Sequence, residues 1–300
     1  MLEAILVVTL VVGQLEPVER GYVEELGYRV VERSTVSAEL AEHWASPAAT
    51  GARQLLLQAA SGAPTWLRVI ERPHASGYQA LQTHGWNANE ILVEDPDALA
   101  AQFAEPGSSF KVIGPPEALG SNGSVIAMQA LGPAGELNYF TRIPPQGGTF
   151  IKTPAASYVD RTFIAVIGGP EMTAMRRFYS EVLGAKVTEP YKAKVNVLNA
   201  AHGLPADHES DLAIVAISDG FILELDQYPT TATTRATPTD ELPAGLAKVS
   251  FEVTDLDSRA LPWLRTPQSV SAAPYDGRRA GLLKGAAGEL IELVERLPRP

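Results

Sequence analysis

The chain has 300 residues, of which 45% are hydrophobic, and a formal net charge of −11 at pH 7. This length predicts about two domains, and the hydrophobic content is typical of a chain that folds around a packed core. The charges are spread without a cluster of Lys and Arg, which argues against nucleic acid or an anionic membrane as a partner. The absence of cysteine excludes disulfides, thiolate nucleophiles and thiolate metal sites. We therefore expect a cytoplasmic protein whose partner is a small molecule.

The first predicted element is a buried strand. Residues 4–12 form a continuous apolar run, rich in β-branched side chains, that ends at Gly13. The run lacks a basic flank and a convincing cleavage site, and it is too short to span a membrane as a helix. A short β-branched run bounded by glycine is typical of a strand inside a sheet.

The sequence after this strand is repeated in the second half of the chain. Apolar residues at helical spacing follow residues 4–12 and again follow the apolar run 163–167. Each of these predicted helices ends in a Leu-Gly pair, at Leu26-Gly27 and at Leu183-Gly184, before another strand begins. The two halves therefore start with the same strand, helix and strand.

Later segments of the two halves also correspond. The alternating strands at 66–73 and 222–229 both end in proline, at nearly the same distance from the first strand of their half. A strand followed by an acidic helix start occurs at 90–99 and again at 250–257. Each half then ends in a turn and a strand, at 132–140 and 285–293. The chain is thus an internal duplication, and each half contains two similar units.

Motifs in the second half carry a resemblance to a known superfamily. They are Phe178-Tyr179 before Leu183-Gly184, Val253 before Asp255-Leu256-Asp257, and the sequence GELIEL at 288–293. In register with the repeats, they resemble the paired modules of the vicinal oxygen chelate superfamily, the group of glyoxalases, bleomycin-resistance proteins and extradiol dioxygenases. The resemblance implies an α+β fold of four βαβββ modules forming two paired domains. We expect a degenerate N-terminal domain at 1–143, a linker at 144–160, and an active or ligand-binding C-terminal domain at 161–300.

The resemblance also implies a divalent metal, held by His, Gln or Glu at equivalent strand positions. In the second half these positions fall on or near Ile164, Glu224, Lys248 and Glu292. In the first half they fall on Val7, Arg68, Ala88 and Tyr139. A protonated lysine has no lone pair, and two carboxylates give too few ligands for a tight transition-metal site. We expect no metal and no other cofactor, and the alternative is a divalent metal at Glu224 and Glu292.

Lys248 and Glu292 have two interpretations. They form a salt bridge that replaces the ion, or they are catalytic. In the catalytic interpretation, Glu292 or Glu224 is a general base toward a bound carbonyl compound or phenol, and Lys248 stabilises the enolate or phenolate. Ser250, next along the same strand face, and Tyr228, at the start of a polar loop, are candidate substrate contacts.

Polar residues also gather on one face of the predicted first-half strands. Strand alternation places Arg68, Glu90 and Tyr139 on the side opposite their apolar neighbours. They could bind a polar ligand, or Arg68 and Glu90 could simply pair with each other.

The histidines give weaker signals. His202 and His208 lie in a Gly- and Pro-containing segment whose spacing matches no metal motif, so they are candidate proton shuttles in a loop that closes over the site. His43, His74 and His84 are expected at the surface.

Three classes of function follow. The first is a metal-independent enzyme with isomerase or lyase acid–base chemistry on a small aromatic or carbonyl metabolite. The second is a non-catalytic small-molecule-binding or resistance protein. The third is a divalent-metal enzyme, similar to extradiol dioxygenases or glyoxalases, that recruits a histidine from 202–208. Each half could form its own site, or the halves could exchange modules with a second chain. The second arrangement predicts a homodimer.

Overall fold

The computed structural model describes residues 2–119, 123–147, 151, 153–217, 220–257 and 260–296. The first module contains β1 (Leu2–Val12), α1 (Leu15–Arg20), β2 (Arg29–Thr35), α2 (Ala38–His43), β3 (Arg53–Gln58) and β4 (Trp66–Glu71). The second contains β5 (Gly85–Val93), α3 (Pro96–Phe103), β6 (Lys111–Leu119), β7 (Val125–Leu131) and β8 (Leu137–Arg142).

The third module repeats the plan of the first. It contains β9 (Val159–Gly169), α4 (Met172–Arg177), β10 (Lys186–Val187), β11 (Tyr191–Ala193), α5 (Asn196–His202), β12 (Ser210–Ala216) and β13 (Ile222–Gln227). The fourth contains β14 (Gly245–Val253), β15 (Arg265–Ser269), β16 (Arg279–Lys284) and β17 (Leu290–Glu295). The helix expected after β14 is absent from the described residues 254–257 and 260–264, although Asp255 accepts a hydrogen bond from the Asp257 backbone as at a helix start.

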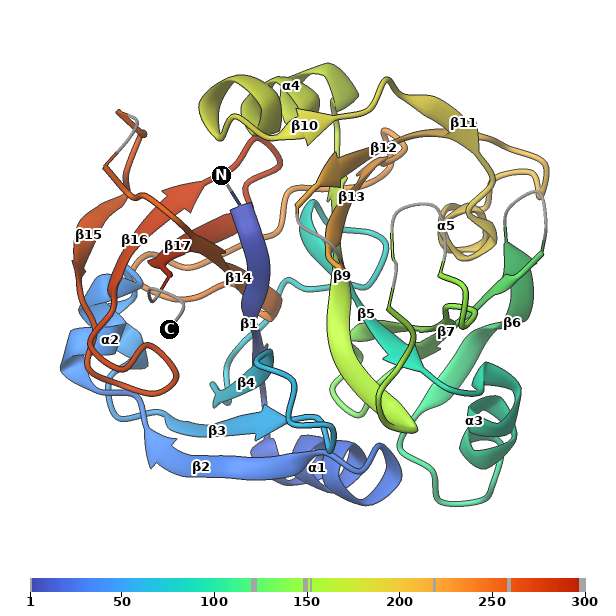
Figure 1. The fold of residues 1–300 in the computed structure, drawn as a ribbon, viewed down its shortest axis with the longest axis horizontal. Coiled ribbons are helices and arrows are strands. Elements are labelled where there is room, and N and C mark those ends of the chain that lie inside the picture. The colour runs from blue at the N-terminus through green and yellow to red at the C-terminus, as the bar shows by residue number, and fades with distance from the viewer. Residues whose placement is uncertain are drawn as a thin grey trace.

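The modules pair as first with fourth and second with third. One sheet, the outer-module sheet, has the strand order β15-β16-β17-β14-β1-β4-β3-β2. The other, the inner-module sheet, has the order β10-β12-β13-β9-β5-β8-β7-β6. Figure 1 shows the two sheets curling side by side, with β1 and β9 near the middle of the molecule.

This pairing corrects the expectation that each half closes its own site. Antiparallel ladders join β1 to β14 and β5 to β9, so each sheet takes one module from each half. The boundaries at 143 and 161 therefore separate the two sequence repeats. They do not separate the two sheets, because each sheet contains strands from both halves of the chain. Within the expected linker, residues 148–150 and 152 lie outside the described residues.

Three apolar clusters form the core. The largest joins both sheets and the helices on their outer faces, and it includes Leu10, Tyr22, Trp86, Tyr179 and Phe251. The second covers the inner face of the inner-module sheet together with α5, and the third covers the inner face of the outer-module sheet together with α2. Strand alternation separates these faces, so side chains two residues apart share one environment. None of the described helices is long and apolar enough to cross a membrane.

Candidate functional site

The residues expected at the site of each half divide between the two sheets. Arg68, Lys248, Ser250 and Glu292 lie on β4, β14 and β17 of the outer-module sheet. Glu90, Tyr139 and Glu224 lie on β5, β8 and β13 of the inner-module sheet, with Tyr228 just after β13. The expected combinations of Lys248 with Glu224 and of Arg68 with Glu90 are therefore wrong. The inner face of each sheet carries its own cluster of polar residues. We call the cluster on the outer-module sheet the outer-module site and the cluster on the inner-module sheet the inner-module site.

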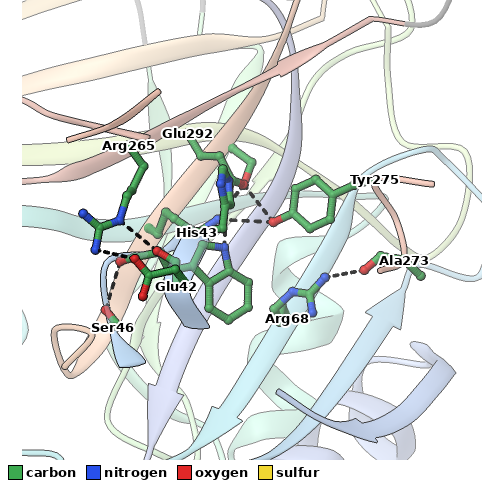
Figure 2. Close-up of polar contacts among 11 residues, drawn as sticks. Glu42, His43, Ser46, Arg68, Arg265, Ala273, Tyr275 and Glu292 are labelled. Carbon is green, nitrogen blue, oxygen red and sulfur yellow. Dashed lines mark hydrogen bonds and ion pairs between the residues drawn. The ribbon is translucent and has the colours of Figure 1, made fainter. Parts of the chain in front are cut away.

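Glu292 is the centre of the outer-module site. Its Oε1 accepts hydrogen bonds from His43 Nε2 and Trp44 Nε1, both at 3.0 Å. Its Oε2 lies 2.6 Å from Lys248 Nζ and accepts from the Tyr275 hydroxyl at 2.8 Å and from the Ser250 hydroxyl. Figure 2 shows His43 and Tyr275 directed at this carboxylate. Five donors use all the acceptor positions of one carboxylate.

Lys248 and Glu292 form a buried ion pair. Burial opposes the charge on Glu292, but Lys248 and His43 outweigh it and hold the pKa of that carboxyl well below its usual range. Burial lowers the pKa of Lys248 to about 8, although Glu292 favours its charged form. Neither side chain is exposed. The structure thus agrees with the interpretation of these residues as a salt bridge.

α2 closes the outer-module site with the protein's own side chains. Ser37 caps the start of this helix, accepting from Leu40 N at 3.1 Å, and Leu40 and Ala41 pack into the inner-face cluster. The helix ends at His43, so His43 and Trp44 reach Glu292 and are completely buried. The expectation of a surface His43 is wrong. It failed because α2 lies across the inner face of the sheet.

Arg68 packs beside this group. Its guanidinium lies 5.4 Å from the centre of the Trp44 ring and 5.7 Å from that of Tyr275. It donates to Gln54 Oε1 at 2.7 Å and to the backbone carbonyl of Ala273, the second of which is visible in Figure 2. Arg68 is 2% exposed, so it is part of the packed interior.

Carboxyl groups line the inner-module site. Glu224 and Asp226 are two residues apart on β13, so both side chains extend from the inner face, and each affects the pKa of the other. Glu90 lies on β5, where it is opposite Ile164 of β9. Its Oε1 accepts a hydrogen bond from the Thr141 hydroxyl at 2.6 Å. Glu224 is only half-buried, whereas Asp226 and Glu90 are buried.

Burial raises the pKa values of these carboxyl groups. Burial, with repulsion from Glu224, raises the pKa of Glu90 to about 8. Burial also raises the pKa of Glu224, and burial together with Glu224 raises that of Asp226 well above its usual value. Like charges this close cannot both ionise cheaply, so Glu224 and Asp226 titrate as a pair that shares a proton.

Tyrosines surround the carboxyl groups. Tyr139 is opposite Glu90 in the β5–β8 ladder, and its pKa is raised by burial and by the nearby acids. The ring of Tyr228 packs against Gly168, where an added Cβ would lie 2.4 Å from the ring. Tyr191 shares a ladder row with Leu212 and Asp226 and is 46% exposed, which puts an aromatic ring where this face meets solvent.

His202 connects two loops, whereas the His208 side chain is exposed. His202 ends α5, and its Nε2 lies 2.8 Å from the Leu81 carbonyl while its Nδ1 lies 2.7 Å from the Thr231 hydroxyl. Because the carbonyl can only accept, Nε2 carries the proton and Nδ1 accepts. Both ring nitrogens are then used. His208 is exposed and lines a surface cleft of about 170 Å³ that also contacts Tyr228, Lys192 and Asp211.

The residues present do not fit a divalent metal. Glu224 and Glu292, the expected ligand pair, lie in different sheets, and Glu292 has no free acceptor position. Across the ranges that the structure describes, no group of three or more His, Asp or Glu side chains is placed to hold a metal ion.

Sequence reasoning missed several members of both sites. Asp226 follows Glu224 by two residues in an alternating strand, so strand periodicity alone could have found it. Thr141 follows Tyr139 in the same way. Trp44 and Tyr275 reach Glu292 from a short helix and a loop, and no sequence period predicts such contacts.

Solved structures with the same overall arrangement support the fold. Glyoxalase I from Zea mays matches with a TM-score of 0.64 at 15% identity, over 97% of this chain and 92% of that chain. A putative dioxygenase from Bacillus subtilis matches with a TM-score of 0.61 at 12% identity, over 99% and 86%. No family model and no curated protein matches the sequence. The chain therefore has the same overall fold as these two proteins.

Proposed function

We propose that this chain, which has the vicinal oxygen chelate fold, is a metal-independent enzyme that carries out acid–base chemistry on a small carbonyl or aromatic compound. The inner-module site is its active site, and the outer-module site is structural. The observation that carries the proposal is the pair of neighbouring carboxyl groups on one face of β13, Glu224 and Asp226, of which Glu224 is half-buried and Asp226 is buried.

A carboxyl pair that shares one proton offers an acid and a base side by side. The ionised member can take a proton from the carbon next to a carbonyl group, and the protonated member can donate one. The raised pKa values shift both steps from the usual carboxyl range toward higher pH. Glu292 lacks this capacity, because five hydrogen-bond donors already occupy it.

Neighbouring groups support the charge that such a reaction develops. Tyr139 keeps its proton, since its pKa is raised, and so can donate a hydrogen bond to an enolate oxygen. The apolar residues of the same face, including Ile164 and Ile222, would hold the carbon skeleton and exclude water.

Exchange of substrate protons with solvent tests the proposal without knowledge of the product. Aryl ketones and 2-oxo acids are incubated in D₂O with the protein, and deuterium incorporation next to the carbonyl is followed by ¹H NMR. Wild type should accelerate exchange for at least one class, and Glu224→Gln and Asp226→Asn should lose about a hundredfold or more of that rate. Glu105→Gln, at an exposed glutamate, is the matched control and should retain it.

The same experiment separates the enzyme from a binding protein. Saturable binding of these compounds without exchange would contradict the proposal and favour a small-molecule-binding protein with this fold. Equal loss of exchange in Lys248→Met and Glu224→Gln, with both variants folded, would return catalysis to the outer-module site.

A further inference from the structure

The two sites occupy equivalent places in the duplicated fold. In the outer-module sheet, one ladder row contains Arg68, Thr9 and Lys248. In the inner-module sheet, the equivalent row contains Glu224, Val166 and Ala88. The residues that end β4 and β13 confirm the correspondence, because Glu71 accepts from the first backbone N–H of α1 and Gln227 from that of α4, at 3.1 and 3.0 Å.

The next row corresponds in the same way. Ser250 and Glu292 are neighbours across β14 and β17, and Glu90 and Tyr139 are neighbours across β5 and β8. Asp226 is an additional acid, since the equivalent residue of β4 is Ile70. The charge of the sites is therefore inverted. The outer-module site contains two cations and one carboxylate, and the inner-module site contains three carboxyl groups.

The outer-module site shows which group balances a carboxylate here. The Lys248 ammonium donates to Glu292 at 2.6 Å and to Ser250 at 2.9 Å, and it lies 5.2 Å from the centre of the Trp44 ring. An ammonium between carboxylate, hydroxyl and aromatic face is a favourable arrangement when buried. The protein supplies that ammonium from its own β14.

The inner-module site has the same kinds of partner and lacks the ammonium. Ala88 stands where Lys248 stands in the other sheet. In the described part of the chain, the groups that act on Glu90, Glu224 and Asp226 are other acids and Thr141, with no Lys or Arg among them. Asp226 is 1% exposed, and its Oδ1 has no hydrogen-bond partner. A buried acceptor without a donor is costly unless a ligand satisfies it.

We propose that the inner-module site binds a ligand through a primary ammonium group. The carboxyl groups of Glu224, Asp226 and Glu90 accept hydrogen bonds from this ammonium, as Glu292 accepts one from Lys248. Hydroxyl donors and acceptors of Thr141 and Tyr139 complete the surroundings, and the exposed ring of Tyr191 lies at the solvent side. This inference rests on the proposed function in placing the active site here. It adds that the substrate carries an amine beside its carbonyl or aromatic group.

Charge selectivity is the direct test. The probes are benzylamine, its neutral counterpart benzyl alcohol, and benzoate, each titrated into the full-length protein by isothermal calorimetry at pH 7. Benzylamine should bind at least tenfold more tightly than benzyl alcohol, and benzoate should not bind. Glu224→Gln and Asp226→Asn should each weaken benzylamine at least tenfold, while Glu105→Gln leaves it unchanged. Both neutral variants relieve repulsion, so thermal unfolding should show them folded and no less stable than wild type.

Proton release gives an independent signature. Glu90 has a pKa of about 8 and holds a proton at pH 7, and an incoming ammonium should displace that proton, so the binding enthalpy should vary with the ionisation enthalpy of the buffer. Equal affinity for benzyl alcohol, or benzylamine affinity unchanged in Glu224→Gln, would overturn the inference. So would Mn²⁺ binding that Glu224→Gln abolishes while benzylamine neither binds nor competes.

Failure of this inference and failure of the proposed function give different results. Amine binding without any exchange of carbon-bound protons would support the ammonium site and contradict the acid–base enzyme. Proton exchange in simple ketones that benzylamine does not inhibit would support the acid–base enzyme and contradict the ammonium site.

Discussion

The Lys248 ammonium lies 2.6 Å from Glu292 in the outer-module sheet, and neither side chain is exposed to solvent. Because the pair is buried, loss of one partner leaves an uncompensated charge in the core. Lys248→Met should therefore lower the free energy of unfolding by about 3–5 kcal/mol. Urea unfolding followed by circular dichroism measures this loss.

A double variant shows whether the loss comes from the unpaired charge. Lys248→Met combined with Glu292→Leu removes both charges and should recover part of the stability. A double variant less stable than Lys248→Met alone would mean that the bonds from His43, Trp44 and Tyr275 to Glu292 contribute more than the charge costs.

Stability should fall as the pH rises through neutrality. Burial raises the pKa of Glu136 and of Glu289 from 4.5 to about 7, and it raises that of Glu90 to about 8. The folded chain thus holds protons that the unfolded chain releases, and stability declines between about pH 4.5 and 8, by about 1.4 kcal/mol per pH unit for each group. Glu292 acts in the opposite sense, but only below its usual pKa of 4.5.

Urea unfolding between about pH 5 and 8 measures this slope. Glu136→Gln removes one of the titrating groups and keeps an amide that can bond Tyr22, so its slope should be smaller than that of wild type. Glu289 is the equivalent group, bonded by Tyr179 at 2.9 Å, and Glu289→Gln should flatten the slope similarly. A wild-type unfolding free energy that increases with pH over this range would contradict the burial of these acids in protonated form.

The repeats in the sequence were sufficient to predict the modules, and they were insufficient to predict how the modules pair. Hydrophobic periodicity reports which face of a strand is buried, whereas the edge at which β1 meets β14 depends on the path of the whole chain. For the same reason, Glu224 was grouped with Lys248, which belongs to another sheet. Strand alternation nevertheless identifies Glu90 and Tyr139 from the sequence, and the ligand position implied by the family resemblance identifies Glu224.

Arg235 should contribute strongly to the joining of the two sheets. Its guanidinium donates to the backbone carbonyl of Leu246 on β14 and to that of Trp86 on β5, both at 2.6 Å. It also lies 4.9 Å from the centre of the Tyr78 ring. Arg235→Met leaves these buried carbonyls without donors and should cost about 2–4 kcal/mol of unfolding free energy. Benzylamine affinity should remain unchanged in the folded variant, and a concurrent loss of affinity would show that sheet pairing shapes the inner-module site.

A lysine placed at Ala88 should fill the inner-module site with its own ammonium. Ala88 shares a ladder row with Val166 and Glu224, as Lys248 shares one with Thr9 and Arg68. Ala88→Lys should therefore abolish benzylamine binding and should be more stable than Ala88→Met, which adds similar volume without charge. Thermal unfolding at pH 7 compares the two variants.

Ala165 provides the matched control for this comparison. It is 2% exposed, like Ala88, but it faces the apolar cluster shared by both sheets. A lysine there meets no carboxyl group, so Ala165→Lys should be less stable than Ala165→Met by several kcal/mol. The order of stability should thus reverse between neighbouring strands of one sheet, with lysine favoured only at Ala88. Methionine favoured at both positions would show that the three acids of the inner-module site do not attract an ammonium.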